Sequence, residues 1–177
     1  DSQDNAIFVK SDIGLQDLRD PFGFQHPAQT AYVYYQGFDA VIVTIHLSWS
    51  DEDLREQEKT LLKSLIQDMS QIDPDVMFVG DFNIVEYDLN TDYQNIYELA
   101  DELGMEVMTP TGQPGVGTTH AGNRYDHFMI SQDLANEEAI SCQIITYAGS
   151  HLIMAKEVSD HVPMVAYFST DARFRDR

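Results

Sequence analysis

The sequence predicts one α/β domain in which strands dominate and helices are inserted between them. Short runs rich in β-branched and aromatic residues recur along the chain, as is typical of strands. Two other segments carry apolar residues at helical spacing. No repeat or low-complexity linker divides the 177 residues, and 43% hydrophobic content is enough to build one core. This combination favours a layered α/β sandwich over a doubly wound nucleotide-binding sheet.

The first half of the chain is expected to hold three strands and a helix. Residues 6–10 (Ala-Ile-Phe-Val-Lys) predict a strand, and the Pro- and Gly-bearing residues 14–27 predict a loop. Residues 30–35 and 38–47 flank a Gln-Gly pair, which indicates a hairpin. The Ser-Asp-Glu-Asp sequence at 50–53 has the form of a capping box. The helix behind it places six apolar residues at helical spacing: Leu54, Leu61, Leu62, Leu65, Ile66 and Met69.

The second half alternates in the same way. Residues 75–79 read as a short buried strand, and residues 92–103 as a second helix that ends at Gly104. Three more strands are expected near residues 124–131, 140–147 and 162–168. Cys142 lies in one of them and is the only cysteine, so an intrachain disulfide and a thiolate zinc site are excluded. We expect it to be buried and structural.

Charge is the strongest bulk feature. Ten Lys and Arg against thirty Asp and Glu give 10 − 30 = −20, with a pI near 4.2. Such a surface repels polyanions at long range, which counts against a long nucleic-acid substrate and for a small phosphate ester. No apolar run is long enough to span a membrane. We expect a soluble protein, bacterial cytoplasmic or secreted, with the compartment left open.

Polar side chains gather at three predicted strand ends. Residues 79–83 (Val-Gly-Asp-Phe-Asn) end a buried strand, and alternation sends Asp81 and Asn83 to one side of the chain. A carboxylate and an amide so placed can activate and orient a water, although Gly-Asp-x-Asn alone is also ordinary turn chemistry. Residues 125–128 (Tyr-Asp-His-Phe) and 159–163 (Ser-Asp-His-Val-Pro) place an acid and a histidine at two further strand starts.

In this order, the three segments resemble the last three signature motifs of the endonuclease/exonuclease/phosphatase superfamily, the DNase I-like enzymes. Ile-His-Leu at 45–47 is similar to the earlier strand-end histidine of the family, and residues 18–22 are a looser match to its Arg-x-Pro segment. Residues 6–9 resemble the strand that follows the metal-binding glutamate. The resemblance covers nearly the whole chain. It implies a four-layered α/β sandwich, with two packed mixed sheets and helices outside.

The resemblance also implies a role for each matching residue. Asp81 would be the base or orienter of the attacking water, and Asn83 would position that water and a phosphate oxygen. His161 would stabilise charge that develops in the transition state, with Asp126 fixing its tautomer. His46 would donate to the phosphate or the leaving group. The reaction implied is in-line attack of activated water on a phosphate ester by a phosphodiesterase, nuclease or phosphatase.

The implied cofactor is Mg²⁺ or Mn²⁺, which would neutralise phosphate oxygens. Asp160 would lie beside the metal, and Arg19 is a candidate phosphate contact. The family's strand-end glutamate, its principal metal ligand, and its Asn motif precede the point where this sequence starts. Gln57 and Glu58 do not replace them, because we expect that pair to face solvent on the first helix. We therefore expect a partial domain spanning 1–177, the C-terminal portion of a longer protein.

Several alternatives stay open at this point. The chain could be a catalytically incomplete fragment or a non-catalytic binding domain on the same scaffold. The substrate could be nucleic acid, a small-molecule phosphate or a lipid phosphate, and a missing N-terminal segment or a second chain could complete the sheet. The Gly-rich residues 111–118 are expected to form a flexible loop beside the site. The remaining histidines are expected to be structural or surface groups: His26, His120, His127 and His151.

Overall fold

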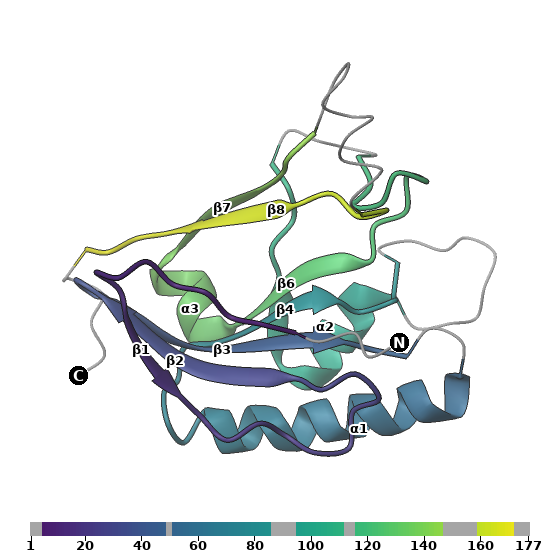
Figure 1. The fold of residues 1–177 in the computed structure, drawn as a ribbon, viewed down its shortest axis with the longest axis horizontal. Helices are drawn as coiled ribbons and strands as arrows, with labels where there is room; N and C mark the ends of the chain where they lie inside the picture. The colour runs from purple at the N-terminus through teal and green to yellow at the C-terminus, as the bar shows by residue number, and fades with distance from the viewer. Residues whose placement is uncertain (1–4, 49–50, 86–94, 112–115, 147–158, 172–177) are drawn as a thin grey trace.

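The computed structural model describes residues 5–48, 51–85, 95–111, 116–146 and 159–171 (Figure 1). Its strands are β1 (Gly14–Asp17), β2 (Gln29–Tyr35), β3 (Phe38–His46), β4 (Val76–Asp81), β5 (Met105–Val107), β6 (Asp126–Ser131), β7 (Ala139–Ile144) and β8 (Met164–Phe168). Its helices are α1 (Glu52–Met69), α2 (Ile96–Leu103) and α3 (Gln132–Glu137).

Six strands form one mixed sheet in the order β1-β2-β3-β4-β6-β5. The predicted hairpin is confirmed: β2 and β3 pair antiparallel, and Gln36 takes a φ of 57° in the turn between them. The α1 crossover then makes β4 parallel to β3, so that both strands end at the same edge of the sheet. Because β6 runs antiparallel to β4, the start of β6 lies at that edge too.

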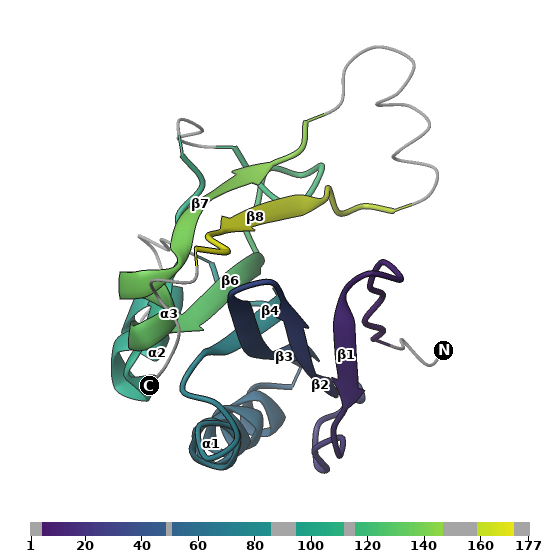
Figure 2. The same ribbon diagram turned by 90° about the vertical axis from the view of Figure 1, so that its left-hand side faces the viewer.

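The two faces of this sheet carry separate cores. On one face, α1 and α2 pack against β3 and β4 around residues such as Phe78, Phe82 and Leu99. On the other face lies the antiparallel pair β7–β8 (Figure 2). This pair buries Cys142 against Met77 and Ile130. The expected α/β sandwich is therefore confirmed, and Cys142 is buried as expected. Within the described residues the second sheet has two strands.

Two local predictions near the start of the chain were wrong. Residues 6–10 form no strand, and the Phe8 side chain is 91% exposed. The strand β1 instead arises inside the predicted loop, where it pairs antiparallel with β2. The Tyr34 ring lies over Gly14, where a Cβ would fall within 2.2 Å of its ring carbons, so a larger residue there would displace this exposed ring. The prediction also missed β5 and α3, which are three and six residues long.

The helix boundaries follow local capping. The N-cap of α1 is Asp51, whose carboxylate accepts from the backbone N–H of Leu54; Ser50 lies outside the described residues. Helix α2 begins after an Asn95 capping box. It ends at Gly104, as predicted, where the backbone takes a φ of 68°. Residues 92–94 of the predicted helix are outside the described part. Among the residues that the structure describes, no helix combines the length and the hydropathy that crossing a bilayer requires.

Candidate active site

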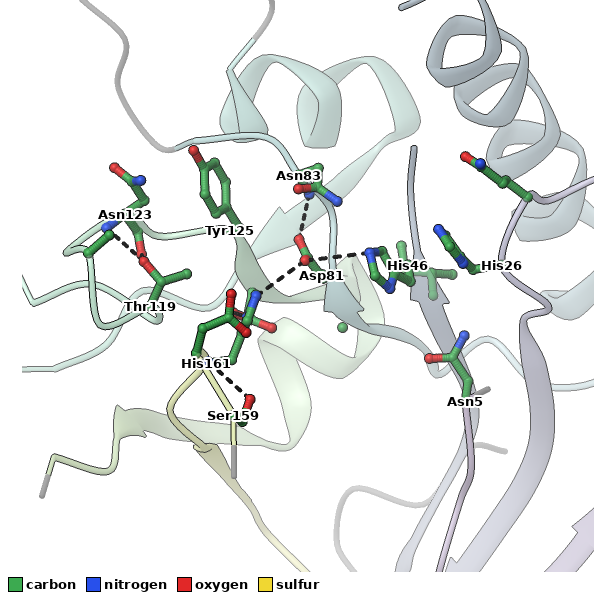
Figure 3. Close-up of a pocket in the computed structure, with 16 residues that line it drawn as sticks. Asn5, His26, His46, Asp81, Asn83, Thr119, Asn123, Tyr125, Ser159 and His161 are labelled. Atoms are coloured by element: carbon green, nitrogen blue, oxygen red, sulfur yellow. Dashed lines mark hydrogen bonds and ion pairs between the residues drawn. The ribbon is translucent and has the colours of Figure 1, made fainter. Parts of the chain in front are cut away.

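Four of the predicted catalytic residues meet at the common edge of β3, β4 and β6. His46 is in register with Asp81, and Asp81 with Asp126, across three adjacent strands. His161 reaches them from the segment before β8, and its Nδ1 lies 2.7 Å from Asp126 Oδ2. Figure 3 shows Asp81 between the two imidazoles. These side chains line one pocket of about 830 Å³, to which Asn83 also contributes.

A strained turn aims Asp81 into the pocket. Gly80 takes a φ of 143°, and a Cβ there would lie 2.0 Å from the Ile45 carbonyl oxygen, so only glycine fits. Asn83 also takes a positive φ, of 50°, and its backbone N–H donates to Asp81 Oδ1 over 2.8 Å. The Asn83 amide donates to the Leu47 carbonyl over 2.8 Å, which ties the turn to the end of β3. Phe82, between the two polar residues, is fully buried, as alternation predicts.

The second carboxylate oxygen of Asp81 faces both histidines. Asp81 Oδ2 lies 3.7 Å from Nε2 of His46 and 3.7 Å from Nε2 of His161. Burial raises the pKa of the Asp81 carboxyl, an effect that the hydrogen bond from Asn83 and the two imidazoles only partly oppose. A carboxylate with a raised pKa between two imidazoles is typical of acid–base sites.

The pKa values of His46 and His161 shift in opposite directions. Burial lowers the pKa of His46; the charge of Asp81 opposes this shift, and the imidazoles of His26 and His161 add to it. Burial acts the same way on His161, but the hydrogen bond to Asp126 and the charges of Asp126, Asp81 and Asp160 outweigh it, so its pKa is raised. The site therefore favours a neutral imidazole on one side of Asp81 and an imidazolium on the other.

The start of β6 is fixed by a residue that the sequence did not single out. Thr118 is fully buried, and its hydroxyl accepts from the backbone N–H groups of Tyr125 and Asp126. The backbone N–H of Val162 donates to the Thr118 carbonyl, which brings the His161 segment alongside. Residues 112–115 of the expected flexible loop lie outside the described residues, but Thr118 is an ordered part of the site's support.

Two further predictions differ in outcome. Asp160, the predicted neighbour of the metal, is exposed and lines the same pocket as Asp81. Arg19, the candidate phosphate contact, does not line that pocket. Its guanidinium carbon lies 5.2 Å from the ring centroid of Phe22 instead, a cation–π distance. The looser match to the Arg-x-Pro segment therefore did not bring Arg19 to the site.

The sequence also missed His26. Its ring stacks on that of His46, with centroids 4.2 Å apart and planes at 25°, and it lines the pocket (Figure 3). From the sequence we expected a structural or surface group there and did not place His26 beside the catalytic candidates. For His127 that expectation is confirmed, because its ring is buried and its Nε2 lies 2.9 Å from the Ile84 carbonyl oxygen. His151 lies outside the described residues.

The pocket can be compared with what a hard cation requires. Within the described residues no three His, Cys, Asp or Glu side chains are arranged to hold a metal. However, Mg²⁺ commonly binds through one or two carboxylates, with water and phosphate oxygens completing the shell. Asp160 and Asp81 are two carboxylates on one pocket, and no Lys or Arg among the described residues lines it. The donor chemistry present therefore fits such a cation.

Comparison with known proteins identifies the fold. No protein-family model and no curated protein matches the sequence. Solved structures do match. An endonuclease/exonuclease/phosphatase family protein from Bacteroides thetaiotaomicron aligns with a TM-score of 0.57 at 11% identity, over 90% of this chain and 66% of that one. This chain has the endonuclease/exonuclease/phosphatase fold.

Two other structures with this fold show how widely its chemistry ranges. The endonuclease domain of TRAS1, a telomere-specific non-LTR retrotransposon, aligns with a TM-score of 0.62 at 14% identity, over 90% of this chain and 68% of that one. A mannosyl-6-phosphatase from Bacteroides thetaiotaomicron aligns with a TM-score of 0.60 at 11% identity, over 88% and 67%. The DNase I-like fold that the motifs implied is confirmed.

Proposed function

We propose that this chain hydrolyses phosphate esters at the pocket around Asp81. The observation that carries the proposal is one carboxylate, with its pKa raised by burial, held 3.7 Å from two imidazoles of opposite protonation tendency. Solved structures with the same fold include an endonuclease and a sugar phosphatase, which supports phosphate-ester hydrolysis as the reaction class.

Each side chain has a defined task in the proposed reaction. Asp81 accepts a proton from a water whose oxygen bonds to phosphorus in line with the leaving group, and the bond from phosphorus to that group breaks. Asn83 orients this water. The His161 imidazolium, held by Asp126 over 2.7 Å, stabilises negative charge on the phosphate oxygens. His46, on the opposite side of Asp81, donates to the phosphate or the leaving group.

We also propose that the reaction depends on Mg²⁺ or Mn²⁺. Asp160 would hold the ion, while Asp81 on the same pocket acts as the base. When bound, the ion would supply positive charge to the phosphate oxygens, which no described Lys or Arg in the pocket provides.

The composition of the pocket favours a small phosphate ester over a long nucleic acid. The net charge of −20 repels a polyanion at long range, and no described Lys or Arg lines the pocket to offset it. The walls instead carry neutral polar groups, including Asn5, Gln25, Asn123 and Tyr125. Amides and a phenol donate and accept hydrogen bonds in the way that a hydroxyl-rich leaving group requires.

We propose in addition that further strands cover the β7–β8 pair, supplied by an upstream segment or by a second chain. On this pair Ile140 and Tyr167 are 66% and 47% exposed. Apolar side chains on a two-stranded sheet are the usual mark of a missing partner. Sedimentation of the wild type and of Ile140→Lys tests the second chain as the source. A dimer that dissociates in the variant indicates a second chain, and a monomer in both excludes one.

The hydrolysis proposal is tested with three substrates: a generic phosphomonoester, a generic phosphodiester and a single-stranded oligonucleotide. Each is incubated with Mg²⁺, with Mn²⁺ and with a chelator. We expect metal-dependent turnover, highest on the small esters, that falls about 100-fold or more in Asp81→Asn. The matched control is Asp133→Asn, an exposed carboxylate on α3, which should keep full activity. Absence of turnover on all three substrates would contradict the proposal and favour a non-catalytic binding domain.

A further inference from the structure

His26 reaches the site on a loop that is docked onto helix α1. Phe24 of this loop packs against the main core, and Ala28 at its end is fully buried. At Gly23, which has a φ of 100°, an added Cβ would lie 2.9 Å from a methyl carbon of Leu61 on α1. The ring of His26 is thus presented to the pocket from a segment that packs closely on the helix.

One buried carboxylate links this loop to the end of β3. The side chain of Glu58, on α1, is fully buried. Its Oε1 accepts from the backbone N–H of Gln25 over 2.8 Å, and its Oε2 accepts from the backbone N–H of Ser48 over 2.7 Å. Gln25 adjoins His26, and Ser48 is two residues beyond His46. The two carboxylate oxygens of Glu58 therefore hold the two backbone segments that carry the stacked imidazoles, the loop of His26 and the end of β3.

The buried Glu58 carboxylate fixes two segments of backbone relative to each other. Burying a carboxylate is unfavourable, and its charge is compensated here by two backbone donors from separate segments. Those donors lie 33 and 10 residues from Glu58 in sequence, so the bonds fix the position of one segment relative to the other. The 4.2 Å separation of the two rings depends on that relative position.

We propose that His26 is a further substrate-contacting residue of the site, and that Glu58 is the positioning residue that holds His26 against His46. His26 lies beyond His46 as seen from Asp81, on the side of the pocket where Asn5 also lies (Figure 3). In that place its ring lines the pocket beside the ring of His46. The stack also limits rotation of the His46 ring, which keeps the His46 nitrogen directed at Asp81.

The positional part is tested by NMR, with no need for activity. In the wild type the amide protons of Gln25 and Ser48 should exchange slowly. Glu58→Ala should remove the protection of both and should move the His46 ring signals in the direction that His26→Ala moves them, because both variants remove a neighbouring ring current. The control is Asp73→Asn, a buried carboxylate before β4 that accepts from the backbone N–H of Asp75.

Glu58→Gln guards against a failure of Glu58→Ala to fold. The amide keeps one acceptor oxygen, so we expect one of the two backbone N–H groups to keep its protection and the other to lose it. The positional proposal is overturned if neither amide loses protection in the Glu58 variants. It is also overturned if the His46 ring signals in Glu58→Ala have the same chemical shifts as in the Asp73→Asn control.

The kinetic part rests on the proposed function and uses the small phosphate ester that the wild type turns over. His26→Ala should lower kcat/KM about 3- to 10-fold, mainly through KM, as loss of one neutral hydrogen bond to the substrate does. Glu58→Ala should lower it by up to about 100-fold, because it displaces His46 as well. The double variant should match Glu58→Ala alone, since Glu58 acts on His26 through position.

The kinetic outcomes separate this inference from the proposed function. Two outcomes would refute the role of His26 while leaving hydrolysis at Asp81 intact. One is a double variant whose loss in kcat/KM is the product of the two single losses, and the other is a His26→Ala enzyme with unchanged KM and kcat. A wild type without turnover would refute the proposed function and the substrate contact together. The NMR result for Glu58 would then still decide the positional part.

Discussion

Replacement of Asp126 by Asn tests the centre of the site most directly. The substitution keeps the shape of the side chain but removes the charge that faces His161 Nδ1 at 2.7 Å. A hydrogen bond to a charged group contributes about 1.5–3 kcal/mol, which corresponds to about 10- to 150-fold in rate if it is lost from the transition state. The side chains of His161 and Asp126 are 31% and 23% exposed, so solvent screens the pair and we expect the lower half of that range.

The sign of the accompanying pH effect follows from the same contact. Asp126 raises the pKa of His161, so Asp126→Asn should lower it, and the imidazolium should lose its proton at a lower pH than in the wild type. The alkaline limb of the kcat/KM profile should move to lower pH, measured on the small phosphate ester with circular dichroism as the check on folding. An unshifted alkaline limb with activity within about two-fold of the wild type would refute the assigned role.

Three further predictions concern protonation, packing and the strained turn. In an NMR titration of the wild type, the pKa of His161 should lie above the ordinary histidine value and that of His46 below it; the reverse order would refute the acid–base assignment. Phe82→Ala should lower the free energy of unfolding by about 3–5 kcal/mol in urea, because its ring is fully buried. Phe22→Ala is the matched control, since that ring is 76% exposed and its loss should cost about 0.5 kcal/mol or less. Gly80→Ala should abolish activity and cost at least about 1–3 kcal/mol of stability, because the new methyl group meets a backbone carbonyl of β3; wild-type behaviour would contradict the turn geometry.

The part of the site that could be predicted from sequence is the part built by strand ends. Residues 79–83 combine a buried apolar run with a Gly and two alternating polar residues, and this pattern predicts that Asp81 and Asn83 lie on one side of the chain. The helix between the hairpin and this run requires a parallel crossover, which brings the ends of β3 and β4 to one edge. His46 and Asp81 were therefore predictable neighbours once both strands were recognised.

Strand prediction failed where the partner mattered more than the residue types. Residues 6–9 have the β-branched and aromatic content of a strand, yet pair with nothing in the described part of the chain. Residues 14–17 (Gly-Leu-Gln-Asp) have poor strand propensity but lie beside the regular edge of β2. Strand propensity measures fit to a neighbouring surface, and a single sequence does not reveal which surface is free.

The prediction that Glu58 faces solvent was wrong, because its charge was given more weight than its position in the helical repeat. Positions 58, 62, 65 and 69 are spaced by four, three and four residues, so the helical repeat itself puts Glu58 on the face of the buried Leu62, Leu65 and Met69. A carboxylate on that face demands donors, and these come from backbone N–H groups 33 and 10 residues away. The helical repeat could have indicated that Glu58 is buried. Only the folded structure shows that its hydrogen-bond donors lie beside the two stacked histidines. A charged residue in register with a buried stripe is therefore better taken as evidence of a polar partner than as an exposed exception.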